Sequence, residues 1–268
     1  MSTVDTYREG TPCWVDLSST DAEAAKAFYS GLLGWSFTDM PMGDGMTYSM
    51  ASLKDRWVAG LSQQFPDQAA AGMPSYWASY LAVDDADAAA ARAVEAGAAL
   101  LVPPSDVPND SGRFFVTTDP GGAAIGFWQA KNHQGTGIVN EPGTVVWHEL
   151  TVADVSAVLP FYQSVAGVGV ETAPMGEIGD YTTFMVDGRP VAGALNAQPG
   201  MPNAWTVYFA VPDIEEALVK IPELGGSVLA PAFDIPFGRM AVVADSTGAV
   251  FAAMQLTEAE YDPEPTDR

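Results

Sequence analysis

The sequence predicts an α+β fold made of four strand–helix–strand–strand–strand (βαβββ) units, two in each half of the chain. The first observation behind this prediction is an internal repeat, because Trp14-Val15-Asp16-Leu17 returns as Trp147-His148-Glu149-Leu150 at an offset of 133 residues. The same offset relates Phe28-Tyr29 to Phe161-Tyr162, Tyr48 to Tyr181, and Gly60 to Gly193. A constant offset over several features indicates a duplication. The second observation is that each half contains the pattern of the unit twice.

The first unit begins with a short apolar strand and continues into a helix with recognisable ends. Asp21 is a typical helix-capping residue, the following residues are rich in alanine, and Gly34 suits the left-handed end of a helix. Turns rich in glycine or charge then separate three short strands. The predicted elements are a strand at 13–18, a helix at 22–33, strands at 35–40, 48–53 and 57–62, and a loop at 63–74.

The second unit repeats this order, and the second half of the chain repeats both units. The predicted elements are a strand at 76–83, a helix at 86–96, and strands at 99–102, 113–118 and 124–129, with Pro103-Pro104 in a loop. In the second half, Trp205-Thr206-Val207-Tyr208 matches Trp77-Ala78-Ser79-Tyr80, and Asp245 matches Asp119. The offsets are slightly smaller there, which indicates that loops rather than elements absorbed deletions.

A chain of 268 residues is long enough for two domains, each with its own core. We expect the first domain at 11–130 and the second at 144–257, joined by a polar, glycine-rich linker at 131–143. Residues 1–10 are expected to be a frayed arm, and the residues from Thr257 an exposed acidic tail.

The composition narrows the range of partners. A formal net charge of −23 makes nucleic acid and anionic membranes poor partners, because both require a cationic surface, whereas cationic ligands are favoured. The chain has one cysteine, Cys13, and shows neither a signal-peptide pattern nor an apolar run of membrane length. These features favour a cytoplasmic protein.

Four such units, with Phe-Tyr closing the first helix and Asp-Pro-x-Gly before the last strand, resemble the vicinal oxygen chelate superfamily. That group includes glyoxalase I, extradiol dioxygenases and bleomycin-resistance proteins, and the resemblance runs from about Thr11 to Gln255. It implies that the two units of each half combine into one eight-stranded, cup-shaped half-barrel with flanking helices. The tandem form is similar to two-domain actinobacterial members. A shared fold does not imply a shared activity.

The resemblance also implies where a metal would be held, because metal-dependent members supply His and Glu ligands from four strands. Counting from the landmarks puts these positions at Trp14, Gly60, Ala78 and Gly126 in the first half and at Trp147, Gly193, Thr206 and Ala252 in the second. None of these residues is a conventional metal ligand. We therefore predict neither a metal nor another cofactor, which disfavours glyoxalase I and extradiol dioxygenase chemistry.

The residues at these positions suggest a different kind of cup. Small residues would open a cavity, and a tryptophan would offer a flat apolar face to a planar aromatic guest. Strand alternation puts Asp16 on the face of Trp14, and Glu149 on the face of Trp147. The predicted ligand-binding residues are Trp14, Asp16, Tyr48, Tyr80 and Trp128 in the first cup and Trp147, Glu149, Tyr181, Tyr208 and Met254 in the second. The alternative is that the tryptophans simply fill the cores.

The two carboxylates are costly to bury unpaired. One explanation is a buried ion pair with Arg113 or Arg239; others are contact with a ligand's ammonium or hydroxyl group, or a role as general base. The candidate catalytic residues, should the protein be an enzyme, are Asp16, Glu149 and His148. Alternation turns His148 away from Glu149, which favours a structural role, and His133 is expected to be solvated in the linker.

Two functions remain open. The first is a metal-independent protein that sequesters or carries a flat aromatic metabolite or antibiotic, for resistance or beside a biosynthetic enzyme that would be its partner. The second is a cofactor-free enzyme, for example an isomerase, lyase or hydroxylase-like protein, that converts an aromatic polyketide-type metabolite by acid–base catalysis. The aromatic, acidic cups favour the first.

Overall fold

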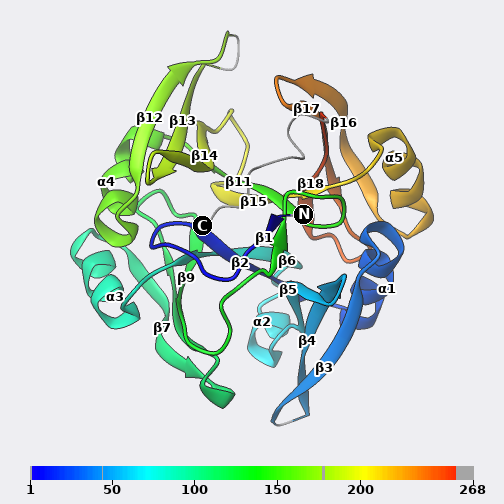
Figure 1. Ribbon diagram of the computed structural model, residues 1–268, viewed down its shortest axis with the longest axis horizontal. Coiled ribbons are helices and arrows are strands. Elements are labelled where there is room, and N and C mark those ends of the chain that lie inside the picture. Colours follow the sequence, from blue (N-terminus) through cyan, green and yellow to red (C-terminus); the bar gives the residue numbers. More distant parts are fainter. Residues whose placement is uncertain (1, 44, 177–178, 258–268) are drawn as a thin grey trace.

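The computed structural model describes residues 2–43, 45–176 and 179–257 of the chain. It contains two curled, eight-stranded sheets with helices along their outer faces (Figure 1). Each sheet is formed by the two βαβββ units of one half, which confirms the predicted α+β fold. Among the residues that the structure describes, no helix is long and apolar enough to cross a membrane.

The first sheet has the spatial order β3-β4-β5-β2-β6-β9-β8-β7. Its first unit comprises β2 (Pro12–Ser19), α1 (Ala22–Leu33), β3 (Ser36–Gly43), β4 (Met46–Leu53) and β5 (Arg56–Gln63). Its second unit comprises β6 (Tyr76–Ala82), α3 (Ala86–Glu95), β7 (Ala99–Val107), β8 (Gly112–Thr118) and β9 (Ala124–Ala130). The first strands of the two units, β2 and β6, lie side by side and antiparallel in the middle of the sheet.

The second sheet repeats this topology with the order β12-β13-β14-β11-β15-β18-β17-β16. Its units are β11 (Val145–Val152), α4 (Val155–Ala166), β12 (Gly169–Pro174), β13 (Asp180–Val186) and β14 (Arg189–Asn196), followed by β15 (Ala204–Ala210), α5 (Ile214–Glu223), β16 (Ser227–Ile235), β17 (Gly238–Ala244) and β18 (Val250–Leu256). Because the topology is the same, each residue of the first cup has a counterpart in the second.

The first helix begins and ends where the sequence predicted. The Asp21 side chain accepts a hydrogen bond from the Ala24 amide at 3.0 Å and so satisfies one of the free N–H groups of α1. Gly34 ends the same helix with φ of 75°, a left-handed conformation that glycine adopts without a steric penalty. These two signals fix the first helix between the strands that it connects.

The two halves pack through their helix-bearing faces. One core joins the first unit to the fourth, with Tyr29 of α1 against Phe209 and Phe251, and α1 lies beside α5 (Figure 1). A second core joins the second unit to the third, and there α3 lies beside α4. Because side chains alternate along a strand, the opposite faces of both sheets remain for the two cups.

A hydrogen-bonded tyrosine crosses each of these cores. The Tyr29 hydroxyl donates to Asp245 of the other half at 3.0 Å, and the Trp77 indole N–H donates to Tyr29 at 2.8 Å. In the second core Tyr162 donates to Asp119 at 2.7 Å, with Trp205 as the matching indole donor. The tyrosine of each repeated Phe-Tyr pair and the aspartate of each last turn are therefore hydrogen-bonded across the boundary between the halves.

Several local predictions were wrong. The first ten residues are not simply frayed, because β1 (Ser2–Thr3) pairs with β10 (Ile138–Val139) of the linker. The predicted loop at 63–74 contains a short helix, α2 (Pro66–Ala70), and a single 3-10 turn, η1 (Pro108–Asp110), follows β7. Pro103-Pro104 lies inside β7 rather than in a loop, since β7 is a sheet edge with register shifts and proline is tolerated there. The expected tail beyond Thr257 lies outside the described residues.

Candidate functional site

The sheet register brings the predicted cup residues of the first half onto neighbouring rungs. Asp16 on β2 lies opposite Gly60 on β5 and Ala78 on β6. Two residues away along β2, Trp14 lies opposite Tyr80, which in turn pairs with Gly126 on β9. Side chains on paired positions of adjacent strands share a face. This arrangement places Trp14 and Asp16 together on the cup floor.

A hydrogen-bonded network connects the polar groups of this floor. The Trp14 indole N–H donates to the Tyr48 hydroxyl at 3.0 Å, and this hydroxyl donates to the Asp16 carboxylate across 3.5 Å. Tyr80 donates a further hydrogen bond to the same carboxylate. The floor of the first cup is therefore a Trp–Tyr–carboxylate–Tyr network.

The second cup contains the same network with Glu in place of Asp. Trp147 donates to the Tyr181 hydroxyl at 2.9 Å, and Tyr181 donates to one Glu149 oxygen at 3.0 Å. The Tyr208 hydroxyl donates to the other Glu149 oxygen at 2.6 Å. Both carboxylate oxygens are thus held, and the chain brings together four of the five residues predicted for this cup. The fifth, Met254, lies on β18 in the same apolar cluster as Tyr208.

The electrostatics of both floors follow from burial. Burial raises the pKa of Asp16 to about 6, and the hydrogen bonds from Tyr80 and Tyr48 only partly offset this effect. Burial also raises the pKa of Glu149, against the opposing effect of Tyr208 and Tyr181. The tyrosine pKa values are raised by the same burial and by the neighbouring carboxylate. The phenols therefore stay protonated and act as donors at neutral pH.

The small residues do not open the cavity that the sequence predicted. A Cβ atom built on Gly60 would lie 1.8 Å from the Tyr48 hydroxyl, and one on Gly193 would lie 1.8 Å from the Tyr181 hydroxyl. In the same way a Cβ on Gly126 would meet the Tyr80 ring at 2.3 Å. The tyrosines thus occupy the space that the glycines leave. The surface of each floor is therefore formed by tyrosine rings and hydroxyl groups rather than by the glycines.

The arginines proposed as partners of the carboxylates lie elsewhere. Arg113 forms ion pairs with Asp87 and Asp106, and Arg239 does so with Glu215 and Asp234, all with partly or largely exposed side chains. The hypothesis of a buried arginine–carboxylate pair in the cups is therefore wrong. Tyrosine hydroxyls, which carry no charge, take that place.

The structure confirms the predicted orientation of His148 but not the predicted exposure of His133. His148 faces away from Glu149, and its Nδ1 lies 2.9 Å from the Ser79 hydroxyl of the other half; burial lowers its pKa to about 3. His133 is not solvated as expected, because its ring packs edge-on against Trp14 at 4.4 Å and near Trp128 at 5.6 Å. Burial lowers the pKa of His133 to about 4. Both rings are therefore neutral at pH 7.

Sequence reasoning missed two residues that contact the first cup. His133 is held there because the Trp128 indole donates to its carbonyl at 3.0 Å. Gln68 of α2 donates to the Tyr76 hydroxyl at 3.1 Å and accepts from Ser18 at 3.4 Å. A lone histidine closely following the last strand was a usable signal for the first contact, whereas nothing in the pattern indicated the second.

The side chains of the cups do not fit a His/carboxylate metal site. Within the described ranges, no three His, Cys, Asp or Glu side chains come together in a group that could hold a metal ion. Each floor contributes a single carboxylate, and its other polar groups are protonated phenols and an indole N–H, which are hydrogen-bond donors rather than metal ligands.

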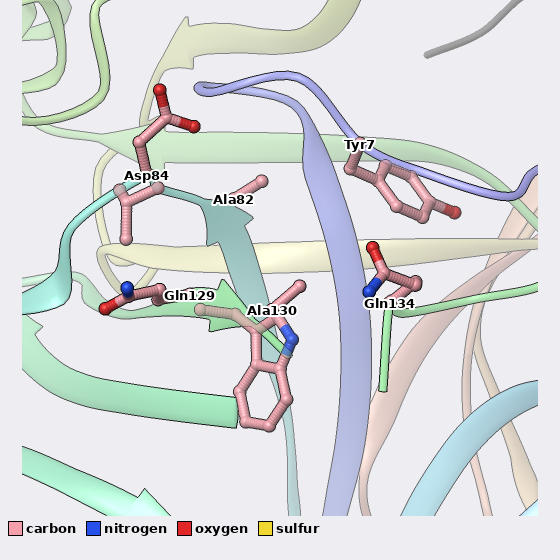
Figure 2. A pocket seen from close by; sticks show the side chains of 8 residues that line it. Tyr7, Ala82, Asp84, Gln129, Ala130 and Gln134 are labelled. Carbon is pink, nitrogen blue, oxygen red and sulfur yellow. The ribbon is translucent and has the colours of Figure 1, made fainter. Parts of the chain in front are cut away.

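A cavity of about 150 Å³ lies apart from these floors, where the ends of β6 and β9 meet the N-terminal arm and the linker (Figure 2). Its lining residues are Tyr7, Ala82, Val83, Asp84, Trp128, Gln129, Ala130 and Gln134. Trp128 is the one predicted cup residue among them. The lining of this cavity does not include the carboxylate network.

Comparison with known proteins identifies a family and relatives that this chain resembles. A family model described as the glyoxalase/bleomycin resistance protein/dioxygenase superfamily matches residues 13–127. A Mycobacterium tuberculosis protein provisionally named glyoxylase CFP32 is 42% identical over 252 residues, which is 93% of this chain and 96% of that protein. The anthracycline biosynthesis protein DnrV of Streptomyces peucetius is 33% identical and aligns over 94% of this chain and 95% of its own length.

Solved structures extend the likeness of the fold. A Mn(II)-bound glyoxalase from Novosphingobium aromaticivorans matches with a TM-score of 0.65 at 15% identity, over 96% of this chain and 85% of that one. The 2,3-dioxygenase LapB from Pseudomonas sp. KL28 matches with a TM-score of 0.62 at 14% identity, over 98% of both chains. Identities this low show a common fold alone. The matching family model and the near full-length relatives show that this chain belongs to the glyoxalase/bleomycin resistance protein/dioxygenase superfamily.

Proposed function

We propose that this protein binds a planar aromatic small molecule and sequesters or carries it, as a resistance or biosynthetic accessory protein. The observation that supports this proposal is the repeated Trp–Tyr–carboxylate–Tyr floor. An indole presents a flat apolar surface, and a carboxylate held by two phenols offers a hydrogen-bond acceptor and a negative charge to a ligand's ammonium group. The net charge of −23 also favours a cationic ligand, because the negative potential of the protein attracts it.

The name of one relative supports this class of ligand. One of them is named for anthracycline biosynthesis, and anthracyclines combine a flat polyketide ring system with an amino sugar. A molecule of that kind would place its rings against the tryptophan and its ammonium group near Asp16 or Glu149. The aromatic residues predicted for the site, Trp128 and Tyr80 in the first cup and Tyr208 in the second, would complete the apolar walls.

Acid–base catalysis on a similar metabolite is the second candidate. The observation that favours it is the Asp16 carboxyl, whose pKa of about 6 suits proton transfer near neutral pH. In this alternative Asp16 or Glu149 would remove a proton and a neighbouring tyrosine would donate one. His148 would take no part, because it faces the other half of the molecule.

Fluorescence titration separates these functions. Flat aromatic amines such as 9-aminoacridine should quench the tryptophan emission saturably and be recovered unchanged after hours of incubation. The double variant Trp14→Leu, Trp147→Leu should weaken binding at least tenfold, or about 1.4 kcal/mol. Conversion of the ligand that stops in Asp16→Asn or Glu149→Gln would instead support the enzyme. An unchanged affinity in the double variant would exclude the aromatic floor as the site.

A further inference from the structure

We propose that the second cup is the ligand-binding cup, that it takes a planar aromatic cation between Trp147 and its two carboxylates, and that the linker closes the first cup. This inference rests on the binding function proposed above and goes further by assigning the site to one half. The duplication makes the comparison possible, because each strand position in one cup has a defined counterpart in the other.

The stacking face of the first cup is already occupied. Trp14 is only 4% exposed, and the His133 ring stands perpendicular to it, at 87° between the ring planes. The linker is fixed in this position by the Trp128 indole, which donates to the His133 carbonyl, and by the Thr136 amide, which donates to the Cys13 carbonyl at 2.8 Å. A planar guest would have to displace His133 to reach the indole of Trp14.

The other end of the first cup is also covered. Helix α2 follows β5 and places Gln68 over the end of the floor, where its side chain bonds to Ser18 on β2 and to the Tyr76 hydroxyl on β6. Ser18 and Tyr76 are directly paired in the sheet. A helix and a phenol therefore stand where a ligand would enter from this side.

The second cup has different residues at the described counterparts of these places. Trp147 is partly exposed, its indole donates to the Tyr181 hydroxyl, and among the described residues no ring stands edge-on to it as His133 stands to Trp14. Met254 takes the place of Trp128, the indole that anchors the linker over the first cup. Ala204, which pairs with Thr151, takes the place of Tyr76, and the connection at 197–203 contains no helix. Among the residues that the structure describes, neither an edge-on ring nor a helix covers Trp147 as His133 and α2 cover the first cup.

The charge of the second cup selects the ligand class. Glu149 lies on its floor, and Glu171 on β12 pairs with Thr183, which pairs with Gly193 beside Glu149. These paired positions share the cup face, so an exposed second carboxylate stands on the wall. The matching position of the first cup is Thr38. One carboxylate on the floor, a second on the wall and a partly exposed indole suit a flat aromatic ring that carries an amine.

Calorimetric titration of the full chain with 9-aminoacridine tests this assignment. We expect one site per chain, and at least a tenfold loss of affinity in Trp147→Leu and in Glu149→Gln. Glu223→Gln, the same charge change on exposed α5, is the matched control and should bind like the wild type. The uncharged analogue acridone should bind more weakly to the wild type, and Glu149→Gln should remove most of that difference.

A gain of binding gives the second readout. The double variant His133→Gly, Gln68→Ala removes side chains from both covered ends of the first cup and should raise the stoichiometry from one site toward two, which loss of folding cannot mimic. Two sites in the wild-type chain, or a tenfold loss in Trp14→Leu with none in Trp147→Leu, would overturn the assignment while leaving the binding function standing. Unchanged stoichiometry in the double variant would contradict closure of the first cup by these side chains. No saturable binding to the wild type would overturn the binding function itself.

Discussion

Each cup carboxylate is satisfied by hydrogen bonds from two tyrosines and not by an arginine. Tyr48 and Tyr80 donate hydrogen bonds to Asp16. In the second cup, Tyr181 and Tyr208 donate to Glu149. A hydroxyl donor stabilises a carboxylate without cancelling its charge, so the negative potential remains available to a ligand. Alternation predicted that Asp16 faces the cup. It could not predict which side chains from other strands reach it.

The raised pKa of Asp16 makes stability depend on pH. In the unfolded chain this carboxyl titrates near its ordinary value of 3.8, whereas burial moves the folded value to about 6. The folded state therefore holds the extra proton between these values, and the contribution of Asp16 to stability is lost as pH rises through about 6.

Replacing Asp16 with Asn should remove this dependence. Relative to the wild type, the Asp16→Asn protein should gain stability between about pH 4 and pH 7, by up to about 3 kcal/mol. Urea unfolding of both proteins across this range measures the difference. A difference that stays constant with pH would contradict a raised pKa.

At the scale of elements, strand pairing explains why glycines recur at matched positions. Gly60 on β5 lies opposite Asp16, and its missing side chain leaves the space in which the Tyr48 hydroxyl sits. Gly193 on β14 plays the same part for Tyr181. The sequence marked these positions as repeated but suggested an empty cavity there. Only the packing of a ring from the neighbouring strand β4 or β13 shows that the space is filled.

Adding one methyl group should therefore disturb these floors. Gly60→Ala and Gly193→Ala should each destabilise the fold by about 1–3 kcal/mol, because the tyrosine must move away from its carboxylate and indole partners. Gly169→Ala on β12 is the matched control, since a Cβ there meets its nearest neighbour at an ordinary 3.5 Å. Thermal and urea unfolding of the three variants compare them. Equal stabilities would show that the tyrosines are not held by the glycines.

At the scale of the whole molecule, the two halves share their cores. The helix of the first unit packs on the fourth unit and the helix of the third packs on the second, so the halves form one body with the cups facing outward (Figure 1). Two aspartates, Asp119 and Asp245, lie in the turns before the last strand of each half. Each accepts a hydrogen bond from a tyrosine hydroxyl of the other half. Such buried, fully bonded pairs specify how the halves meet.

Removing one hydroxyl should weaken the whole molecule rather than one half. Tyr29→Phe leaves the Asp245 oxygen and the Trp77 indole without their partner and should cost about 1–3 kcal/mol; Tyr162→Phe should cost a similar amount. A single unfolding transition, followed by both tryptophan emission and circular dichroism, should shift as a unit. Separate transitions for the two halves would contradict a shared core.

The sequence by itself determined the repeat, the four βαβββ units, and the face on which Trp14, Asp16, Trp147 and Glu149 lie. These features follow from local spacing, helix caps and the two-residue period of strands, which act between near neighbours in the chain. Only the tertiary structure decided what surrounds them: the tyrosines over the glycines, the distant partners of Arg113 and Arg239, and His133 against Trp14. Those contacts join residues far apart in the sequence. They are therefore determined by tertiary packing and cannot be read from the local sequence pattern.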